Sequence, residues 1–294
     1  MIIESAHKIL NKSIRQHKPS LIVLSFSGGY DSMVSSHIAS DWSKKYAHST
    51  NLITISADTL ISADGWREFV SDTARQLKLP RFKIHDTTNL EIWKERMIDK
   101  GYVYRESQHR INFYHLKQVV FRSIIAQYKK YRTDRIMFIN GVRRAESSAR
   151  QNRPEINRQG SGVFVNPLLY WSDKEVEQYR IKHDMPINPF YDSIGNSGDC
   201  LCNWHTHFSM DTIERHAKEA SKIIKPVHGA CIEKWGYGYG ETPRNGLFAD
   251  DAGVQTSFFD LEGVNDTPNL CSGCRKPKAS NETRANYMLQ TMQW

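Results

Sequence analysis

Short apolar runs alternate with amphipathic segments through the first half of this sequence. The fully apolar run 21–24 and the mostly apolar run 52–55 are typical of strands that are buried on both faces of a sheet. Segments with apolar side chains at helical spacing, such as 3–17, predict helices, and Pro19 ends the first of them. The predicted helices are 3–17, 33–42, 66–77 and 114–131, and the predicted strands are 21–24, 52–55, 82–84 and 135–140.

Strands that alternate with helices favour an α/β fold, in which helices cover both faces of a parallel sheet. Ligands of such folds bind beyond the carboxyl ends of the strands. Ser27, Asp58 and Gly141 each follow a predicted strand. We therefore expect these three residues to converge on one crevice.

The amino-acid composition changes past about residue 190, where Gly, Asn, Asp and Ser become frequent. Regular periodicity fades there, apart from a predicted helix over 210–222. The sequence therefore predicts a main α/β domain over 1–194 and a loop-rich, cysteine-containing appendage over 195–294. The appendage has too few apolar runs to form a hydrophobic core alone. This favours a bound metal ion that stabilises its fold.

A glycine turn follows the first predicted strand, in the string Ser27-Gly28-Gly29-Tyr30-Asp31-Ser32. Its two glycines allow the backbone to approach an anion with no Cβ in the way. Backbone N–H groups and the positive end of the following helix then favour phosphate, and the two serine hydroxyls add donors. Asp31 is expected to cap the helix or to help hold Mg²⁺. The string is not a Walker A loop, because no Gly-Lys-Ser/Thr follows the glycines.

Three ordered motifs carry a resemblance to a known family. The glycine turn resembles the SGGxDS loop of PP-loop ATP pyrophosphatases. The string 141–150 resembles the Gly-x-Arg-x-x-Glu-Ser-x-x-Arg signature of the phosphoadenosine phosphosulfate (PAPS) reductase-like group, and the passages 166–176 and 186–191 resemble another stretch of that group. The resemblance covers roughly residues 18–205 and implies an adenine nucleotide α-hydrolase-like, nucleotide-binding fold for 1–194.

The resemblance also implies roles for individual residues. Asp58 would lie near the adenosine, and Asp31 and Arg143 would be catalytic side chains. The implied ligand is ATP, or else PAPS or adenylylsulfate, together with Mg²⁺. Arginine guanidinium groups suit bidentate contacts with phosphate or sulfate. The implied ligand-binding residues are Ser27, Gly28, Gly29, Asp31, Ser32, Asp58, Gly141, Arg143, Glu146 and Arg150.

Four of the five cysteines form two close pairs. Such pairs favour metal ligation over disulfides in a reducing compartment. Four thiolates suffice for a [4Fe–4S] cluster or for tetrahedral Zn²⁺, and the cluster is preferred because related enzymes carry one. The candidate ligands are Cys200, Cys202, Cys271 and Cys274, with His205 and His207 as substitutes.

The chain departs from the family at two points. The cluster-bearing adenylylsulfate reductases have a cysteine pair before the passage that matches 166–168, where this chain has none. Sulfonucleotide reductases attack sulfur with a cysteine in a C-terminal Glu-Cys-Gly-Leu-His motif, and this sequence lacks that motif. Cys231, the unpaired cysteine, is a candidate nucleophile, although a buried structural thiol is the favoured interpretation.

A formal net charge of +8 favours polyanionic partners. The first hypothesis is an ATP pyrophosphatase that cleaves ATP between the α- and β-phosphates and supports sulfur transfer to an acceptor such as DNA or tRNA. The chain resembles the DNA-phosphorothioation ATP pyrophosphatases of the family in its nucleotide loop, its cysteine pairs and its basic charge, which implies a sulfur-donor protein such as a cysteine desulfurase as a partner. The second hypothesis is a sulfonucleotide reductase that releases sulfite. The third is a non-catalytic nucleotide- or nucleic-acid-binding subunit.

The third hypothesis draws on aromatic and basic residues between 204 and 244, which could stack on bases but are more typical of packing around the cysteine site. No apolar run approaches the roughly 20 residues of a membrane span, and the N-terminal segment has no signal-peptide core. We therefore expect a cytoplasmic protein with no membrane partner, and a homodimer is a candidate assembly.

Overall fold

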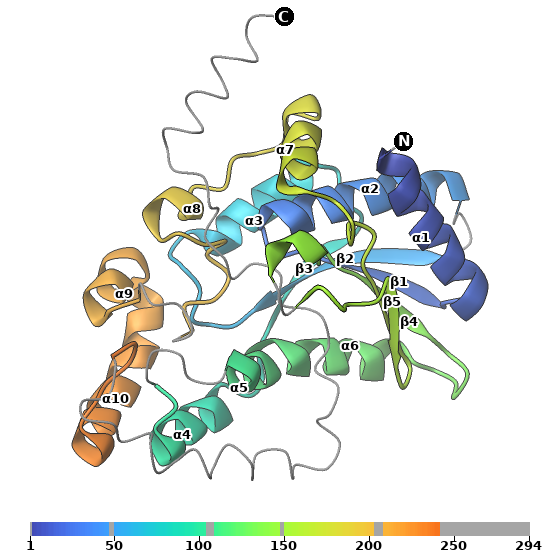
Figure 1. Cartoon of the computed structure of the whole chain (residues 1–294). Helices are drawn as coiled ribbons and strands as arrows, with labels where there is room; N and C mark the ends of the chain where they lie inside the picture. The colour runs from blue at the N-terminus through green and yellow to red at the C-terminus, as the bar shows by residue number, and fades with distance from the viewer. Residues whose placement is uncertain (1, 47–49, 104–108, 148–149, 203–207, 242–294) are drawn as a thin grey trace, which may run out of the picture.

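The computed structural model describes residues 2–46, 50–103, 109–147, 150–202 and 208–241 of the 294-residue chain. A six-stranded sheet lies between layers of helices (Figure 1). The strands lie in the order β3-β2-β1-β4-β6-β5, and all neighbours are parallel except β5 and β6. Their bounds are β1 Leu21–Ser25, β2 Asn51–Asp58, β3 Phe82–Asp86, β4 Ile136–Ile139, β5 Ile156–Gln159 and β6 Gly162–Val165.

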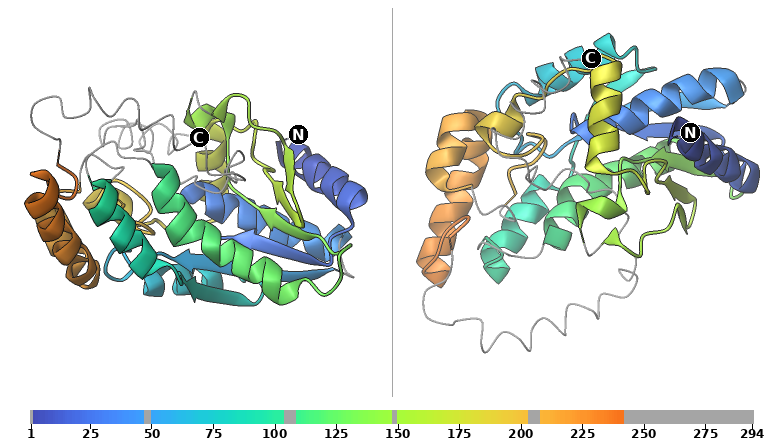
Figure 2. Two further views of the ribbon diagram at one scale, coloured as in Figure 1. Left: turned by 90° about the horizontal axis from the view of Figure 1, so that it is seen from below. Right: turned by 45° about the horizontal axis from the view of Figure 1, so that its top comes forward.

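Helices cover both faces of the sheet, as the sequence predicts. On one face, α1 (Ile2–His17) and α2 (Tyr30–Tyr46) bury Leu10 and Trp42 against β1, β4 and β6. On the other face, α6 (Val119–Tyr128) packs against the alternate side chains of the same strands (Figure 2). The other helical elements are α3 Trp66–Gln76, α4 Leu90–Lys100, α5 His109–Phe113, η1 Tyr114–Gln118, η2 Arg144–Glu146, α7 Asp173–Lys182, α8 Phe190–Ser193, α9 Met210–His216 and α10 Lys218–Trp235.

The predicted α/β class is confirmed, and two local differences have physical causes. The single helix predicted over 114–131 is a π-helical turn, η1, followed by α6. A π turn places an extra residue in one helical turn, which the apolar spacing does not reveal. The predicted strands omit the short hairpin of β5 and β6: the residues of β5 are mostly polar and only partly buried, and β6 has four residues.

The region after residue 194 contains more helix than its composition predicts. The helix predicted over 210–222 is interrupted at Ala217, and α10 then continues to Trp235 through Pro226. Proline inside a helix removes a backbone hydrogen bond, so the residue pattern does not predict a helix across Pro226. Ile224 and Tyr239 join the same core cluster as Met33, so the core is continuous across residue 194. Residues 242–294 lie outside the described part of the chain.

Among the described residues, no helix is both long enough and apolar enough to cross a membrane.

Gly141 follows β4 and touches the backbone of the first turn of α2. A Cβ at this position would lie 2.6 Å from the carbonyl carbon of Asp31 and 2.8 Å from the amide nitrogen of Ser32. We expect Gly141→Ala to lower the free energy of unfolding by about 1–3 kcal/mol, because one of the two backbones must move. Urea unfolding followed by circular dichroism measures the change.

Gly229 provides the matched control for this substitution. It is exposed inside α10, and a Cβ there meets nothing within 4 Å. Gly229→Ala is expected to raise the free energy of unfolding by roughly 0.5–1 kcal/mol, because alanine loses less backbone entropy in a helix. Equal stability of the two variants would contradict the close approach at Gly141.

Candidate functional site

The glycine turn between β1 and α2 is closed from inside by Ser32. The Ser32 hydroxyl donates to the carbonyl of Gly29 at 2.7 Å and accepts from the amide of Ser27 at 3.2 Å. Gly28 has φ +79°, a left-handed conformation that disfavours side chains. The first N–H groups of α2 have no carbonyl partner within the helix, as at any helix start. The loop therefore lies at the positive end of α2, beyond the carboxyl end of β1.

Residues distant in the sequence hold the same loop from outside. The indole nitrogen of Trp66 donates to the carbonyl of Ser27 at 3.0 Å. The amide of Asn188 donates to the carbonyl of Gly28 at 2.9 Å and to that of Ser197 at 3.1 Å. Asn188 lies in a passage of the family resemblance, but no sequence pattern marks its contact with the loop. These bonds give the carbonyls of Ser27 and Gly28 fixed partners within the protein.

Tyr30, in the middle of the loop, stands in a stack of three side chains. Its ring lies 4.5 Å from the ring of Tyr191, at an interplanar angle of 22°. The guanidinium carbon of Arg180 lies 3.3 Å from the centroid of the Tyr30 ring. Arg180 is 5% exposed, so this cation–π contact is largely shielded from water. The stack ties the loop to α7 and to the segment that includes α8.

Asp31 and Arg143 form a bidentate ion pair across the crevice. The Nε and Nη2 atoms of Arg143 donate to the two carboxylate oxygens of Asp31 at 2.9 and 3.1 Å. The Nη1 atom donates to Asp173 at 2.8 Å and to the carbonyl of Trp171 at 3.3 Å. Burial raises the pKa of Asp31, and the charge of Arg143 opposes that rise. In this structure Arg143 contacts carboxylates, whereas the family resemblance implied a contact with phosphate.

Glu146 and Arg150 form a second ion pair, next to the first. Glu146 Oε2 also accepts from the backbone N–H of Arg143 at 2.8 Å. Burial, followed by the nearby charge of Asp31, raises the pKa of Glu146 to about 7. The residues expected from the signature string thus lie together at the end of β4, where they bind one another.

Asp58 ends β2 at the same edge of the sheet, as predicted. Its carboxylate accepts from the backbone of Leu60 at 2.7 Å and from the hydroxyl of Ser62 at 3.2 Å. It also pairs with Arg67 of α3, which in turn pairs with Asp86. The carboxylate therefore orders the connection between β2 and α3.

A small cavity of about 30 Å³ lies beneath the loop, between the ends of β1, β2 and β4. Lys117 and Asp199 line one side of it, and their side chains form a buried ion pair at 2.5 Å. Lys117 belongs to the π-helical turn, a feature that is frequent at functional sites. Ser25 and Asn140 line the side next to the sheet. No motif in the sequence marks any of these four residues.

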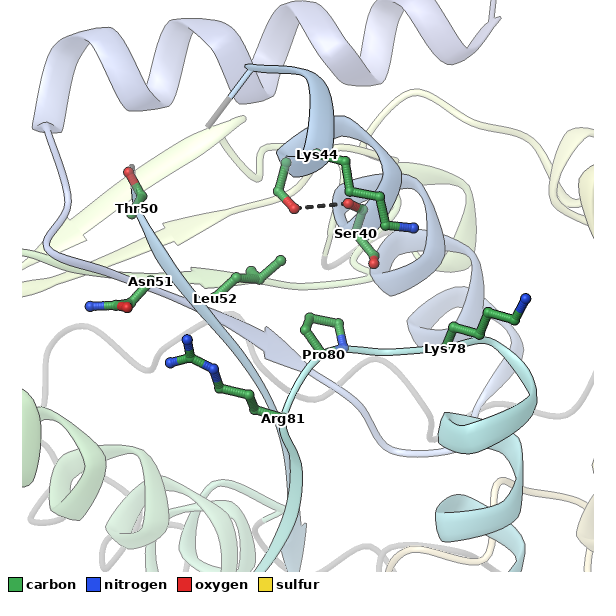
Figure 3. Close-up of a pocket in the computed structure, with 9 residues that line it drawn as sticks. Ser40, Lys44, Thr50, Asn51, Leu52, Lys78, Pro80 and Arg81 are labelled. Atoms are coloured by element: carbon green, nitrogen blue, oxygen red, sulfur yellow. Dashed lines mark hydrogen bonds between the residues drawn. The ribbon is translucent and has the colours of Figure 1, made fainter. Parts of the chain in front are cut away.

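A larger hollow of about 310 Å³ lies at the opposite end of the strands (Figure 3). Asn51 and Leu52 at the start of β2 line it, together with Arg81 just before β3. The glycine turn follows the carboxyl end of β1, whereas this hollow lies at the amino ends of the strands. Position in the fold, rather than size, therefore identifies the candidate site.

Cys200 and Cys202 are buried and lie next to each other in the main core cluster. A hydrogen bond with Cys202 lowers the pKa of the Cys200 thiol. Within the described residues, no group of three or more metal-binding side chains comes together. Cys271, Cys274, His205 and His207 lie outside the described residues. The described chain thus brings together two of the four predicted thiolates.

Cys231 lies in α10 and is fully buried against α4, where its thiol faces the carbonyl of Met97 at 3.6 Å. Burial raises the pKa of Cys231 to about 11. A thiolate is the reactive form of cysteine, so this environment disfavours a nucleophile at neutral pH. The position fits the structural thiol that the sequence analysis favoured.

The family model for the phosphoadenosine phosphosulfate reductase domain matches residues 21–202. This match covers more than half of the chain. It includes the loop 27–32, the ion pairs Asp31–Arg143 and Glu146–Arg150, and the cysteines Cys200 and Cys202. The chain belongs to this family. The predicted membership in the PAPS reductase-like group is therefore confirmed.

Curated relatives match shorter parts of the chain. An adenosine 5′-phosphosulfate reductase of Salinibacter ruber is 41% identical over 75 residues, which are 25% of this chain and 30% of the relative. A phosphoadenosine 5′-phosphosulfate reductase of Alkalilimnicola ehrlichii is 25% identical over 186 residues, which are 60% of this chain and 69% of the relative. The chain thus spans less than a third of the first relative's length.

A solved phosphoadenylyl-sulfate reductase of Candida auris, in complex with phosphate, is similar to 64% of this chain. The match covers 83% of that protein, at 17% identity and a TM-score of 0.44. A likeness at this level adds no argument about the reaction.

Two serines one helical turn apart separate the role of the loop from the role of α2. Ser32 closes the loop, whereas the buried hydroxyl of Ser36 has no hydrogen-bond partner among the described residues. We expect Ser32→Ala to weaken ATP binding by roughly 5- to 20-fold, because loss of an internal hydrogen bond loosens the loop. Ser36→Ala is expected to bind ATP as the wild-type protein does. Isothermal titration calorimetry measures both, and equal affinities would contradict the role of Ser32.

The raised pKa of Glu146 predicts a pH dependence of stability. The folded protein holds the Glu146 proton up to about pH 7, whereas the ordinary value is 4.5. The folded state therefore binds more protons between these values, and this contribution to stability, present below about pH 4.5, is lost as the pH rises through 7. We expect Glu146→Gln to remove roughly 1–3 kcal/mol of the stability difference between pH 5 and pH 8. Urea unfolding at the two pH values measures it, and an unchanged difference would contradict the assignment.

Proposed function

We propose that the crevice at the carboxyl ends of β1, β2 and β4 binds ATP, and that the enzyme cleaves it between the α- and β-phosphates. The observation that carries this proposal is the closed loop 27–32, in a member of the PAPS reductase domain family. The α2 helix begins at Tyr30 within this loop, so its positive end favours phosphate oxygens there. The net charge of +8 supports a polyanionic ligand.

In the proposed reaction, a nucleophile on an acceptor attacks the α-phosphorus of ATP. The bond between the α-phosphorus and its bridging oxygen breaks, and pyrophosphate leaves. Hydrosulfide from a donor then attacks the activated atom of the acceptor, a bond to sulfur forms, and the bond to AMP breaks so that AMP leaves with the electron pair. Loop amides stabilise the charge that develops on the phosphate oxygens, because they are oriented before the ligand arrives.

Mg²⁺ would neutralise the leaving pyrophosphate. Both oxygens of Asp31 already accept from Arg143, so phosphate oxygens and water are the main ligands available to the ion. Arg143 acts as a positioning residue, since it holds the first turn of α2 through Asp31.

The cysteine pair at 200 and 202 supports a metal site within the same proposal. Two adjacent buried thiols, one of them with a lowered pKa, suit ligation of a [4Fe–4S] cluster or of Zn²⁺. Cys271 and Cys274 would complete a set of four. A nucleic acid acceptor and a sulfur-donor protein belong to this proposal as partners.

Reduction of a sulfonucleotide to sulfite is the second candidate function. The names of the curated relatives, which are adenosine 5′-phosphosulfate and phosphoadenosine 5′-phosphosulfate reductases, favour it. This reaction needs a thiolate nucleophile at the sulfur. Among the described cysteines, Cys231 is buried and has a raised pKa, which counts against such a role for it.

One assay separates the two functions. Protein purified without oxygen is incubated with Mg²⁺ and ATP, with and without DNA or tRNA, and released pyrophosphate is measured. A parallel reaction with PAPS or adenylylsulfate and a dithiol reductant is assayed for sulfite. The proposal predicts pyrophosphate from ATP, and the same rate for Cys231→Ser, because that thiol packs in the core.

Sulfite release with no ATP turnover would overturn the proposal in favour of the second function. Nucleotide binding with neither activity would favour a non-catalytic binding subunit. The metal site is tested by measuring the iron and zinc contents of the wild-type protein and of the Cys200→Ser variant. The proposal predicts that the variant loses the bound metal.

A further inference from the structure

Three buried polar atoms without hydrogen-bond partners meet at the small cavity beneath the phosphate loop. They are the hydroxyl oxygen of Ser25 and both amide atoms of Asn140, which have no partner among the described residues. Both residues line the cavity, and Asn140 is 2% exposed. Buried amides in native proteins are nearly always hydrogen-bonded, so a cluster of such atoms around one cavity indicates a missing partner.

The sheet itself brings these side chains together. Leu24 and Ile139 are paired in the register of β1 and β4, and Ser25 and Asn140 are the next residues of the two strands. Neighbouring positions on parallel strands direct their side chains to the same face, which is here the face that α6 covers. The backbone N–H of Asn140 bonds to the carbonyl of Val165 at 2.9 Å, which holds the residue in line with the sheet.

The size of the cavity limits what can enter it. A volume of about 30 Å³ holds a water molecule or the edge of a larger group, but not a whole aromatic base. Ser25 ends β1 and lies two residues before Ser27 of the loop. Ser27 and Gly141 also line the cavity, so a nucleotide that binds at the loop lies next to it.

The chemistry of Asn140 selects the kind of edge. A carboxamide offers one donor and one acceptor side by side, and it forms two hydrogen bonds with the amino group and adjacent ring nitrogen of adenine. We infer that Asn140 is a specificity-determining residue, which binds the amino-bearing edge of the adenine base. This inference rests on the proposed ATP-binding function and adds the residue that reads the base.

The test compares two nucleotides that differ in the amino group alone. The probes are ATP and purine riboside triphosphate, which lacks the 6-amino group, each with a methylene bridge between the α- and β-phosphates to prevent cleavage. We expect the wild-type protein to bind the ATP analogue roughly 10- to 100-fold more tightly, the range that a bidentate contact provides. In Asn140→Ala this ratio is expected to fall close to one.

Asn166→Ala is the matched control. Asn166 follows β6 as Asn140 follows β4 and is fully buried, but it lies outside the residues that line the cavity and donates to the carbonyl of Pro154 at 2.9 Å. Its ratio of affinities is expected to equal that of the wild-type protein. The melting temperature of free Asn140→Ala is expected to match that of the wild-type protein, because the removed atoms have no partner.

The outcomes distinguish this inference from the proposed function. Tight binding of the ATP analogue with the same ratio in Asn140→Ala as in the wild-type protein would overturn the inference alone, and would indicate that a buried water satisfies the amide. A guanine nucleotide that binds as tightly as the ATP analogue, and depends equally on Asn140, would overturn the assignment to adenine. No binding of either probe by the wild-type protein would overturn the proposed function and the inference with it.

Discussion

The ion pair between Asp31 and Arg143 connects the two halves of the site. Asp31 stands in the first turn of α2, directly after the loop of β1, and Arg143 follows β4, the adjacent strand. Both side chains are largely buried, so removal of Arg143 would leave the Asp31 carboxylate without its bidentate partner, at a cost of about 3–5 kcal/mol. Gly141 allows the close approach that this contact requires, because a Cβ there would meet the backbone of Asp31.

The rest of the site depends on this connection. With the start of α2 held against the end of β4, Ser32 can close the loop through its hydrogen bond to Gly29. Trp66 and Asn188 can then donate hydrogen bonds to the loop carbonyls. The amide groups at the start of α2 are then fixed before a ligand binds, so binding does not require the backbone to reorganise. Preorganised donors of this kind are also what stabilises charge in a phosphoryl transfer reaction.

The sequence was informative where a residue acts through its own position on the chain. Ser27, Asp58 and Gly141 were placed at one edge of the sheet because strand ends can be located from apolar runs, and the structure puts all three there. The glycine turn was recognised because its residues are contiguous. Membership in the family followed from three motifs in order, and the match over residues 21–202 agrees with it.

The sequence could not predict contacts between residues far apart along the chain. Asn188 contacts a loop 160 residues away, and Lys117 meets Asp199 across 82 residues. The predicted role of Arg143 rests on the signature alone. The signature does not show that the guanidinium group of Arg143 forms an ion pair with Asp31. Asn140 belongs to a predicted strand by its position, and only the packing around it reveals an amide without a partner.

Phosphate binding by the loop is the central claim, and backbone amide chemical shifts test it most directly. Titration of ATP and Mg²⁺ into ¹⁵N-labelled protein should shift the amide resonances of Gly28, Gly29 and Asp31 in a saturable way. Resonances of Lys78 and Arg81, which line the large hollow at the other end of the strands, should stay unchanged. Shifts centred on that hollow, with the loop resonances unaffected, would contradict the account.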